Sequence, residues 1–330
     1  MKKLFVIIVL LLSISESYAQ LFPVLGGQRA GISTAQFLKI GVGGRATAMG
    51  DAFVAVADDA SSLYWNPAGL VQFNDNQVFF SHNTWVVDIN HEFFGGVYHL
   101  GPEDAVGVSV TALTMQDMKV TTEFAPFGTG EYFTFSDFAV ALTYSKKMTD
   151  KFSFGGTVRY IEETLAKLKM RGVLIDLGTM YWTGLGSTRF AVTFTNFGNQ
   201  LAPDGEVVLV GKRKKSEWQS FSPPTMFRLG FAFEPFETDN QKLTTSAQLN
   251  HPNDNSESVS LGAEYTYREP VIGASLILRG GYKINVDEQD FSVGGGVKIP
   301  LSFATLTVDY SFVNFERLGS AHRLSVIFGI

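Results

Sequence analysis

From about residue 76 to the end of the chain, large apolar residues alternate with small or polar ones at a period of two. In FAVALTYS (138–145), every second residue is Phe, Val, Leu or Tyr, and the residues between them are Ala, Thr or Ser. FRLGFAFE (227–234), SVSLGAEYTY (258–267) and TLTVDYSF (305–312) repeat the pattern. Because side chains alternate between the two faces of a strand, each segment is predicted to be a strand with one apolar and one polar face.

The polar face differs from that of a soluble sandwich. Gly, Ala, Ser and Thr with scattered single charges occupy it, whereas a solvated face is usually rich in Lys and Glu. The chain also holds 29 Phe and 33 Gly. A Phe-rich face suits lipid, a face of small residues suits a crowded lumen, and lipid permits only helices and closed barrels. The pattern therefore predicts an all-β protein, a transmembrane antiparallel β-barrel.

The connections between the expected strands differ at the two ends of this barrel. One set is longer and polar and includes 114–135, 163–171, 197–224 and 313–321, whereas the other set is tight: GPED, MTDK, GLGS, REP and PLS. Outer-membrane barrels have short periplasmic turns, longer outside loops and an even number of strands. We therefore expect an outer-membrane protein of a Gram-negative bacterium, surrounded by outer-membrane lipid. About fourteen strands are expected, near 76–84, 92–99, 105–113, 136–147, 152–162, 172–182, 188–196, 225–234, 242–250, 258–267, 271–284, 290–299, 303–312 and 322–330.

The first nineteen residues have the features of a signal peptide. Lys2 and Lys3 precede the short apolar core LFVIIVLLL, and Ser17 and Ala19 are the small residues expected before a cleavage site. No apolar run of about 18 residues follows, so no transmembrane helix is expected. The absence of Cys excludes disulfides, thiolate metal sites and thiol nucleophiles. The net charge of −6 argues against a nucleic-acid partner.

Residues 20–75 do not alternate and are predicted to form a hatch, or plug, with small helices, ahead of a barrel at 76–330. Within DDASSLYWNPAGL (58–70), Asp58 or Asp59 can cap a short helix at 60–65. Pro67 restricts Asn66 and ends this helix, and Gly69 lets the chain turn away. A helix this short is not stable alone, so it needs a wall to pack against.

The stretch FLKIGVGGRATAMGDAFVAVADDASSLYWNPAGL (37–70) resembles the N-terminal signature of FadL-like outer-membrane barrels. FLKIG and GGRATAMGDAF make it most similar to the PorV/PorQ branch of that family, which is associated with type IX secretion. The resemblance implies a hatch that plugs the lumen of a fourteen-stranded barrel. The hatch-motif residues are Gly43, Gly44, Arg45, Met49, Gly50, Asp51, Asp58, Asp59, Trp65, Asn66, Pro67 and Gly69.

The alternation also places charged residues on the lumen face. Opposite charges removed from bulk water attract strongly, although desolvation offsets part of the gain. We therefore expect Asp58 and Asp59 to face lumen arginines, with Tyr64 and Trp65 packed on the wall, so that these carboxylates dock the hatch rather than perform chemistry. The candidate lumen charges are Arg159, Arg189, Arg228, Arg279 and Arg323, opposed on the same face by Asp176, Glu234, Glu264 and Asp309.

No catalytic site, cofactor site or metal site is predicted. GVGGRA (41–46) fits a dinucleotide fingerprint, but that motif needs a strand before it, a helix after it and a parallel sheet. The adjacent carboxylates at 58–59 and 162–163 point apart on a strand or loop, which is unsuitable for an acid/base couple. The histidines include no HExxH motif, and nothing in the sequence favours a Ser-His-Asp triad.

Two functions of different classes remain open. In the first, the barrel is an interaction protein of type IX secretion, whose outside loops contact secretion-apparatus or secreted proteins. In the second, it is a FadL-like passive transporter of hydrophobic small molecules. The FLKIG and GGRATAMGDAF version of the signature favours the first. The candidate loop contacts are Phe124, Phe127, Tyr132, Trp218 and Phe221, for which a membrane-interface girdle is the alternative role.

Overall fold

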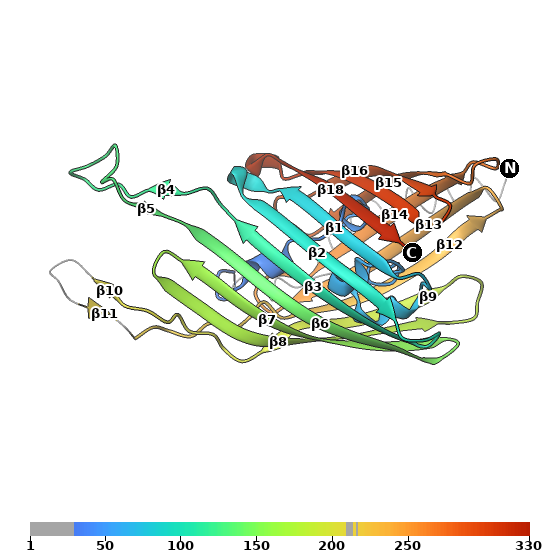
Figure 1. The fold of residues 1–330 in the computed structure, drawn as a ribbon, viewed down its shortest axis with the longest axis horizontal. Helices are drawn as coiled ribbons and strands as arrows, with labels where there is room; N and C mark the ends of the chain where they lie inside the picture. The colour runs from blue at the N-terminus through green and yellow to red at the C-terminus, as the bar shows by residue number, and fades with distance from the viewer. Residues whose placement is uncertain (1–29, 209–213, 216) are drawn as a thin grey trace, which may run out of the picture.

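The computed structural model describes residues 30–208, 214–215 and 217–330, so the expected signal peptide lies outside the described residues. Fourteen antiparallel strands close into a barrel, in which each strand pairs with the next along the chain and β1 pairs with β18 (Figure 1). The all-β barrel prediction is therefore confirmed. Around the wall the strands are β1 Gln77–Thr84, β2 Asn90–His99, β3 Asp104–Thr114, β6 Phe135–Thr149, β7 Phe152–Leu165, β8 Leu168–Trp182, β9 Arg189–Gly198, β12 Met226–Glu237, β13 Gln241–Pro252, β14 Ser258–Arg268, β15 Ser275–Ile284, β16 Phe291–Pro300, β17 Thr305–Asn314 and β18 Ser320–Gly329.

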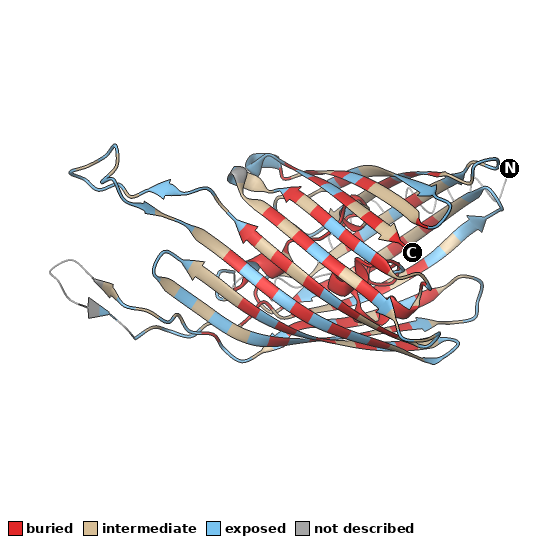
Figure 2. Ribbon diagram, viewed as in Figure 1, coloured by how far each residue is buried: buried red, intermediate tan, exposed pale blue. Residues whose placement is uncertain are grey.

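The period of two becomes an inside and an outside. On β6, Val140 and Leu142 are exposed on the outer surface, whereas Ala139, Ala141 and Thr143 are buried. Figure 2 shows the same banding along most of the wall, with buried and exposed residues in turn. Small side chains face inward because the lumen is filled with other parts of the chain.

The two ends of the barrel differ as the sequence suggested. One end carries the turns at 100–103, 150–151, 183–188, 238–240, 269–274 and 301–304, and we call it the turn end. The opposite end, the loop end, carries 115–134 and 199–225. Each of these two links contains a small two-stranded sheet, β4 Met118–Lys119 with β5 Tyr132–Phe133, and β10 Val207–Val208 with β11 Lys214–Lys215. Both sheets project beyond the barrel rim in Figure 1.

Two boundary predictions are wrong. The expected polar loop at 163–171 is a tight turn, because β7 and β8 continue past the expected boundaries and pair up to Leu165 and Leu168. Glu162 forms ion pairs there with Lys169 and Arg171, so polar strand ends resembled a loop in sequence. In addition, β15 begins at Ser275 rather than 271, since 269–274 form a turn.

The first part of the described chain lies inside the barrel, shown in blue in Figure 1. We call residues 33–73 the hatch. Its elements are η2 Gln36–Lys39, α2 Gly44–Ala48, α3 Ser62–Trp65 and η3 Pro67–Val71; outside it, η4 Val86–Asp88 and η5 Glu316–Leu318 lie in loops. Helix α2 packs against β15–β18, and η3 packs against β3 and β6–β8, so the hatch crosses the lumen. Among the described residues, no helix has the length and apolarity needed to cross a membrane.

Candidate functional site

The hatch is held to the wall by hydroxyl groups that accept from its backbone. Gly43 N–H donates to Ser81 Oγ at 3.2 Å, and Gly44 N–H donates to Ser325 Oγ at 2.9 Å. These N–H groups precede or begin α2, where a helix leaves its first donors unpaired. The small polar residues on the lumen face therefore satisfy the hatch backbone, which would otherwise be buried without partners.

Glycines of the hatch and of the wall let the hatch backbone lie directly against the sheet. Gly50 adopts φ 65°, which favours glycine, and its N–H donates to Ser292 Oγ at 3.0 Å. A Cβ on Gly262 would lie 2.6 Å from the Met49 carbonyl oxygen, and one on Gly281 would overlap the Gly50 backbone. The strand glycines thus provide space for the hatch, besides any effect on wall curvature.

Trp65 and Asn66 fix the centre of the hatch. Trp65 Nε1 donates to the Val42 carbonyl at 2.9 Å. Asn66 Nδ2 donates to the Thr179 carbonyl of β8 at 3.2 Å, while its Oδ1 accepts from the Ala68 N–H at 3.0 Å and so caps η3. The NPAG motif therefore carries both a cap and a contact with the wall.

The remaining members of this motif also have steric roles. Pro67 is the first residue of η3, where its missing N–H costs nothing, and its backbone lies against Gly155 of β7. A Cβ on Gly69 would lie 2.5 Å from the Ala57 carbonyl oxygen. Glycine at position 69 is therefore required by close approach within the hatch.

A charge cluster centred on Arg45 joins the hatch to β14. Arg45 Nη1 contacts Asp58 at 2.5 Å and Asp59 at 2.7 Å, and its Nε and Nη2 each donate to Glu264 at 2.9 Å. Glu264 also accepts from Arg279 Nε at 2.6 Å. One wall carboxylate thus binds a hatch arginine and a wall arginine together.

This cluster reverses the expected docking. The pairing of Asp58 and Asp59 with lumen arginines of the wall is wrong, because Arg45 of the hatch itself takes that place. Asp59 additionally accepts from the Ser61 N–H at 2.9 Å, just ahead of α3. The hatch carboxylates organise the hatch internally, and a hatch cation contacts a wall anion.

Two further anchors lie nearer the loop end. Asp51 pairs with Lys283 of β15. Lys39 Nζ and Gln36 Nε2 donate to the two oxygens of Asp254, at 2.9 Å and 2.7 Å. Burial opposes the charge on the Asp254 carboxylate, but these hydrogen bonds outweigh burial and hold its pKa below the usual value. This loop contact therefore stays charged at neutral and mildly acidic pH.

Arg159 and Arg189 of the wall form buried ion pairs. Arg159 Nη2 donates to Asp176 at 2.7 Å. Arg189 Nη1 donates to Glu234 at 2.9 Å, and its Nε donates to the Ala55 carbonyl of the hatch at 2.7 Å. Arg189 thus also holds the hatch, whereas the hydrogen bonds of Arg159 to described residues lie within the wall.

The remaining candidate arginines have three different environments. Arg228 lies over the Trp65 ring of the hatch, 5.8 Å from its centroid. Arg279 donates to Asp309 at 2.6 Å besides its bond to Glu264. Arg323 has no hydrogen bond or ion pair with any described residue, although it is only 2 % exposed.

Gln248 of β13 is an anchor that the sequence reading missed. Its Oε1 accepts from the N–H groups of Phe53 and Val54, both at 3.0 Å. The available signal was its position on the lumen face of a strand, where it is larger than the usual Gly, Ala, Ser or Thr. Alternation alone does not reveal that such a residue reaches the hatch backbone.

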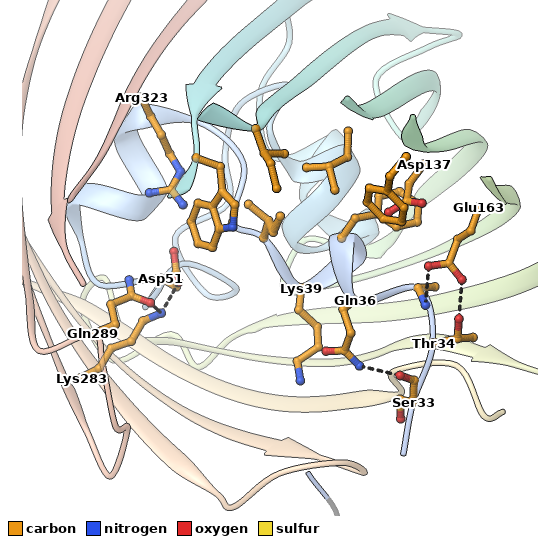
Figure 3. A pocket seen from close by; sticks show the side chains of 18 residues that line it. Ser33, Thr34, Gln36, Lys39, Asp51, Asp137, Glu163, Lys283, Gln289 and Arg323 are labelled. Atoms are coloured by element: carbon orange, nitrogen blue, oxygen red, sulfur yellow. Dashed lines mark hydrogen bonds and ion pairs between the residues drawn. The ribbon is translucent and has the colours of Figure 1, made fainter. Parts of the chain in front are cut away.

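Cavities lie on both sides of the hatch. The loop-end cavity has a volume of about 550 Å³, and Figure 3 shows the side chains that line it. The turn-end cavity is about 280 Å³ and is lined by the Arg45 cluster and by neighbouring wall residues. Hatch residues such as Ala46, Phe53 and Trp65 are buried between them. The lumen is therefore closed by a seated hatch.

The candidate loop aromatics fall into two groups. Phe124 and Phe127 are 97 % and 93 % exposed, and Tyr132 is also exposed; all three belong to the 118–133 segment, which we call the loop hairpin. Trp218 and Phe221 are partly buried within the other long loop, where Trp218 donates to a backbone carbonyl at 3.0 Å. The first group is therefore available for contact, whereas the second stabilises its own loop.

The described residues include no group of three or more His, Asp or Glu that could hold a metal ion. The GVGGRA segment contains the start of α2 inside an antiparallel barrel, so it lacks the parallel sheet that a dinucleotide site requires.

A closed antiparallel wall with an apolar outer face, short turns at one end, longer loops at the other and a seated hatch defines the class: an outer-membrane β-barrel. The sequence matches the family model described as "Type IX secretion system protein PorV" over residues 26–252. The chain therefore belongs to the PorV family and is located in the outer membrane.

Solved structures support the fold independently. The Ralstonia pickettii toluene transporter TbuX is 13 % identical with a TM-score of 0.59, over 88 % of this chain and 97 % of that one. The Pseudomonas putida toluene transporter TodX is 11 % identical with a TM-score of 0.58, over 88 % and 96 %. A Pseudomonas aeruginosa FadL homologue is 12 % identical with a TM-score of 0.53, over 93 % and 98 %. At these identities the likeness concerns the fold, and no curated protein matches the sequence.

Proposed function

We propose that this protein is a non-catalytic docking component of type IX secretion. The barrel anchors it in outer-membrane lipid, and the loop hairpin contacts a secretion-apparatus protein or a secreted protein. The observation that carries the proposal is the combination of a lumen closed by the hatch with aromatic side chains presented beyond the rim. A closed lumen is unsuited to passing proteins, so contact outside the barrel is the remaining way to act on them.

The position of Phe124 and Phe127 favours contact over a membrane girdle. Girdle aromatics lie on the wall at the level of the lipid headgroups. These two residues instead lie between β4 and β5, in the hairpin that projects past the barrel strands. Nearly fully exposed apolar side chains at such a site are typical of a protein-interaction surface.

The test is a double substitution, Phe124→Ser with Phe127→Ser, in cells that lack the native copy. We expect secretion of type IX cargo to fall at least tenfold, since central aromatic contacts can each contribute about 2 kcal/mol or more. The matched control is Val271→Ser with Ile272→Ser, two similarly exposed apolar residues in a turn at the opposite end. Normal secretion by the hairpin variant, with both variants present at equal levels, would contradict the proposal.

The second candidate is passive transport of hydrophobic small molecules. The apolar lining of the loop-end cavity and the likeness to toluene transporters favour it. Uptake of labelled toluene by cells with and without the protein separates the two functions. Docking alone predicts equal uptake, and faster uptake in the cells that contain the protein would support transport.

A further inference from the structure

The loop-end cavity contains a buried guanidinium and a buried carboxyl group that make no hydrogen bond or ion pair with the described hatch residues. Arg323 projects from β18 and Asp137 from β6, and each is 2 % exposed. Neither side chain has a hydrogen bond or ion pair with any described residue. The guanidinium of Arg323 contacts the ring of Trp85, 5.3 Å from its centroid. An ionised group buried without a partner is costly, and a carboxyl group in that position favours its neutral form. A ligand of complementary charge would therefore stabilise the ionised form of each group.

The surroundings of Asp137 favour a cationic or N–H-bearing group. Asp137 lies directly opposite Glu163 in the β6–β7 register. Glu163 already accepts from the Ala35 N–H at 3.0 Å and from the Thr34 hydroxyl. Among the described residues Asp137 has no such donor, and the carboxyl group of Glu163 beside it disfavours the ionisation of Asp137, so a cationic partner would offset both effects. An amine would be bound well at this side of the cavity.

The space between the two groups is apolar. Figure 3 shows Arg323 and Asp137 on either side of a set of hydrophobic side chains. The volume of about 550 Å³ is within the range of small-molecule sites, which have mostly apolar walls and a few fixed polar groups. The apolar lining is Phe37, Ile40, Trp85, Ile89, Leu113 and Phe135.

The other charged groups in the cavity are largely committed. Asp51 is paired with Lys283, and Lys39 with Asp254. Among the described residues that line the cavity, the ionisable side chains left without any hydrogen bond or ion pair are therefore Arg323 and Asp137, on opposite sides of an apolar space. We propose that the loop-end cavity binds a zwitterionic apolar molecule, a short hydrophobic peptide, with its carboxylate on Arg323 and its amine on Asp137.

The cavity lies on the loop-end side of the hatch, and longer loops mark the outside of an outer-membrane barrel. This inference is independent of the docking function: a protein that docks partners through its loop hairpin can lack this site, and the site can exist without docking.

The test is calorimetric titration of the full protein in lipid nanodiscs with the dipeptide leucylphenylalanine, its N-acetylated form and its C-terminal amide. We expect the free dipeptide to bind and each capped form to bind about tenfold more weakly, the scale of one lost charged hydrogen bond. Equal binding of all three forms, or no binding of the dipeptide, would overturn the proposal. So would octanoate binding as tightly as the dipeptide, since octanoate has no group for Asp137.

Two variants test which residue binds each end of the dipeptide. In Arg323→Met the acid and the amide should bind equally, and in Asp137→Asn the free and acetylated forms should bind equally. The matched controls are Arg317→Met and Asp117→Asn, which change exposed residues outside the cavity at the same end of the barrel. If a variant fails to fold, the capped peptides on the parent protein still decide the question. If both folded variants still bind the free dipeptide more tightly than its capped forms, as the parent does, the dipeptide binds elsewhere.

Discussion

At the scale of single residues, the charge cluster at Arg45 shows how the hatch is held. Glu264 has two arginine partners and its side chain is 7 % exposed, whereas the Asp58 side chain is 44 % exposed. Removing one partner from a buried ion pair costs about 3–5 kcal/mol, because the remaining charge stays buried, whereas exposed pairs contribute about 0–1 kcal/mol. Glu264 therefore stabilises the hatch more than Asp58 does, although Asp58 belongs to the recognisable motif.

We accordingly expect Glu264→Gln to loosen the hatch while the barrel remains closed. The measurement is protease cleavage within residues 33–73 in detergent, together with conductance in planar bilayers, and both should rise well above the parent. Asp58→Asn should change the protease cleavage and the conductance each by less than twofold. Glu162→Gln serves as control, because Glu162 also binds two cations but at the rim, away from the hatch. If the Glu264→Gln variant resists protease as well as the Glu162→Gln variant does, the charge cluster at Arg45 does not anchor the hatch.

At the scale of elements, β18 closes the barrel against β1 and β17. Its odd-numbered residues from 323 to 329 are buried and include Arg323 and Ser325, while Leu324, Val326 and Phe328 face outward. The alternation of apolar with small or polar residues along HRLSVIFGI predicts this outward facing of Leu324, Val326 and Phe328. Val326 pairs with Phe80 and Val308 near the middle of both neighbouring strands, so it lies deep in the lipid-facing surface.

Charges on this face of β18 should therefore block assembly. We expect Val326→Asp with Phe328→Asp to reduce folded protein in the outer membrane strongly, since charge on the lipid face costs up to about 2–4 kcal/mol per residue near the midplane. The control is His322→Asp, on the same face but at the loop end of the strand. Quantifying folded barrel in purified outer membranes tests this, and normal amounts of the double variant would mean that the face does not meet lipid.

At the scale of the whole molecule, every wall strand has two neighbours and the hatch fills the centre, so the sheet has no free edge. Such a wall resists detergent because its backbone groups are paired internally. The protein should run faster on an unboiled gel than on a boiled one, and carbonate washing should leave it in the membrane. Release by carbonate without a heat shift would be incompatible with a closed barrel in lipid.

The sequence by itself determined the wall. A period of two lasting from residue 76 to 330 requires strands, and a Phe-rich face opposite a face of small residues requires two different environments, so barrel class and strand number followed. The tight links identified the turn end. The signature at 37–70 identified the hatch, because its glycines and NPAG segment have positions that only particular backbone geometries satisfy.

The tertiary structure alone decided the partners. Alternation places Arg279, Glu264 and Gln248 on the lumen face but does not say which reaches the hatch, because that depends on how the hatch backbone crosses strands far apart in sequence. For the same reason, the sequence paired Asp58 with the wall, whereas Arg45, thirteen residues away, is its partner. Facing is a local property of each strand, but pairing inside a closed lumen depends on distances that only the folded chain sets.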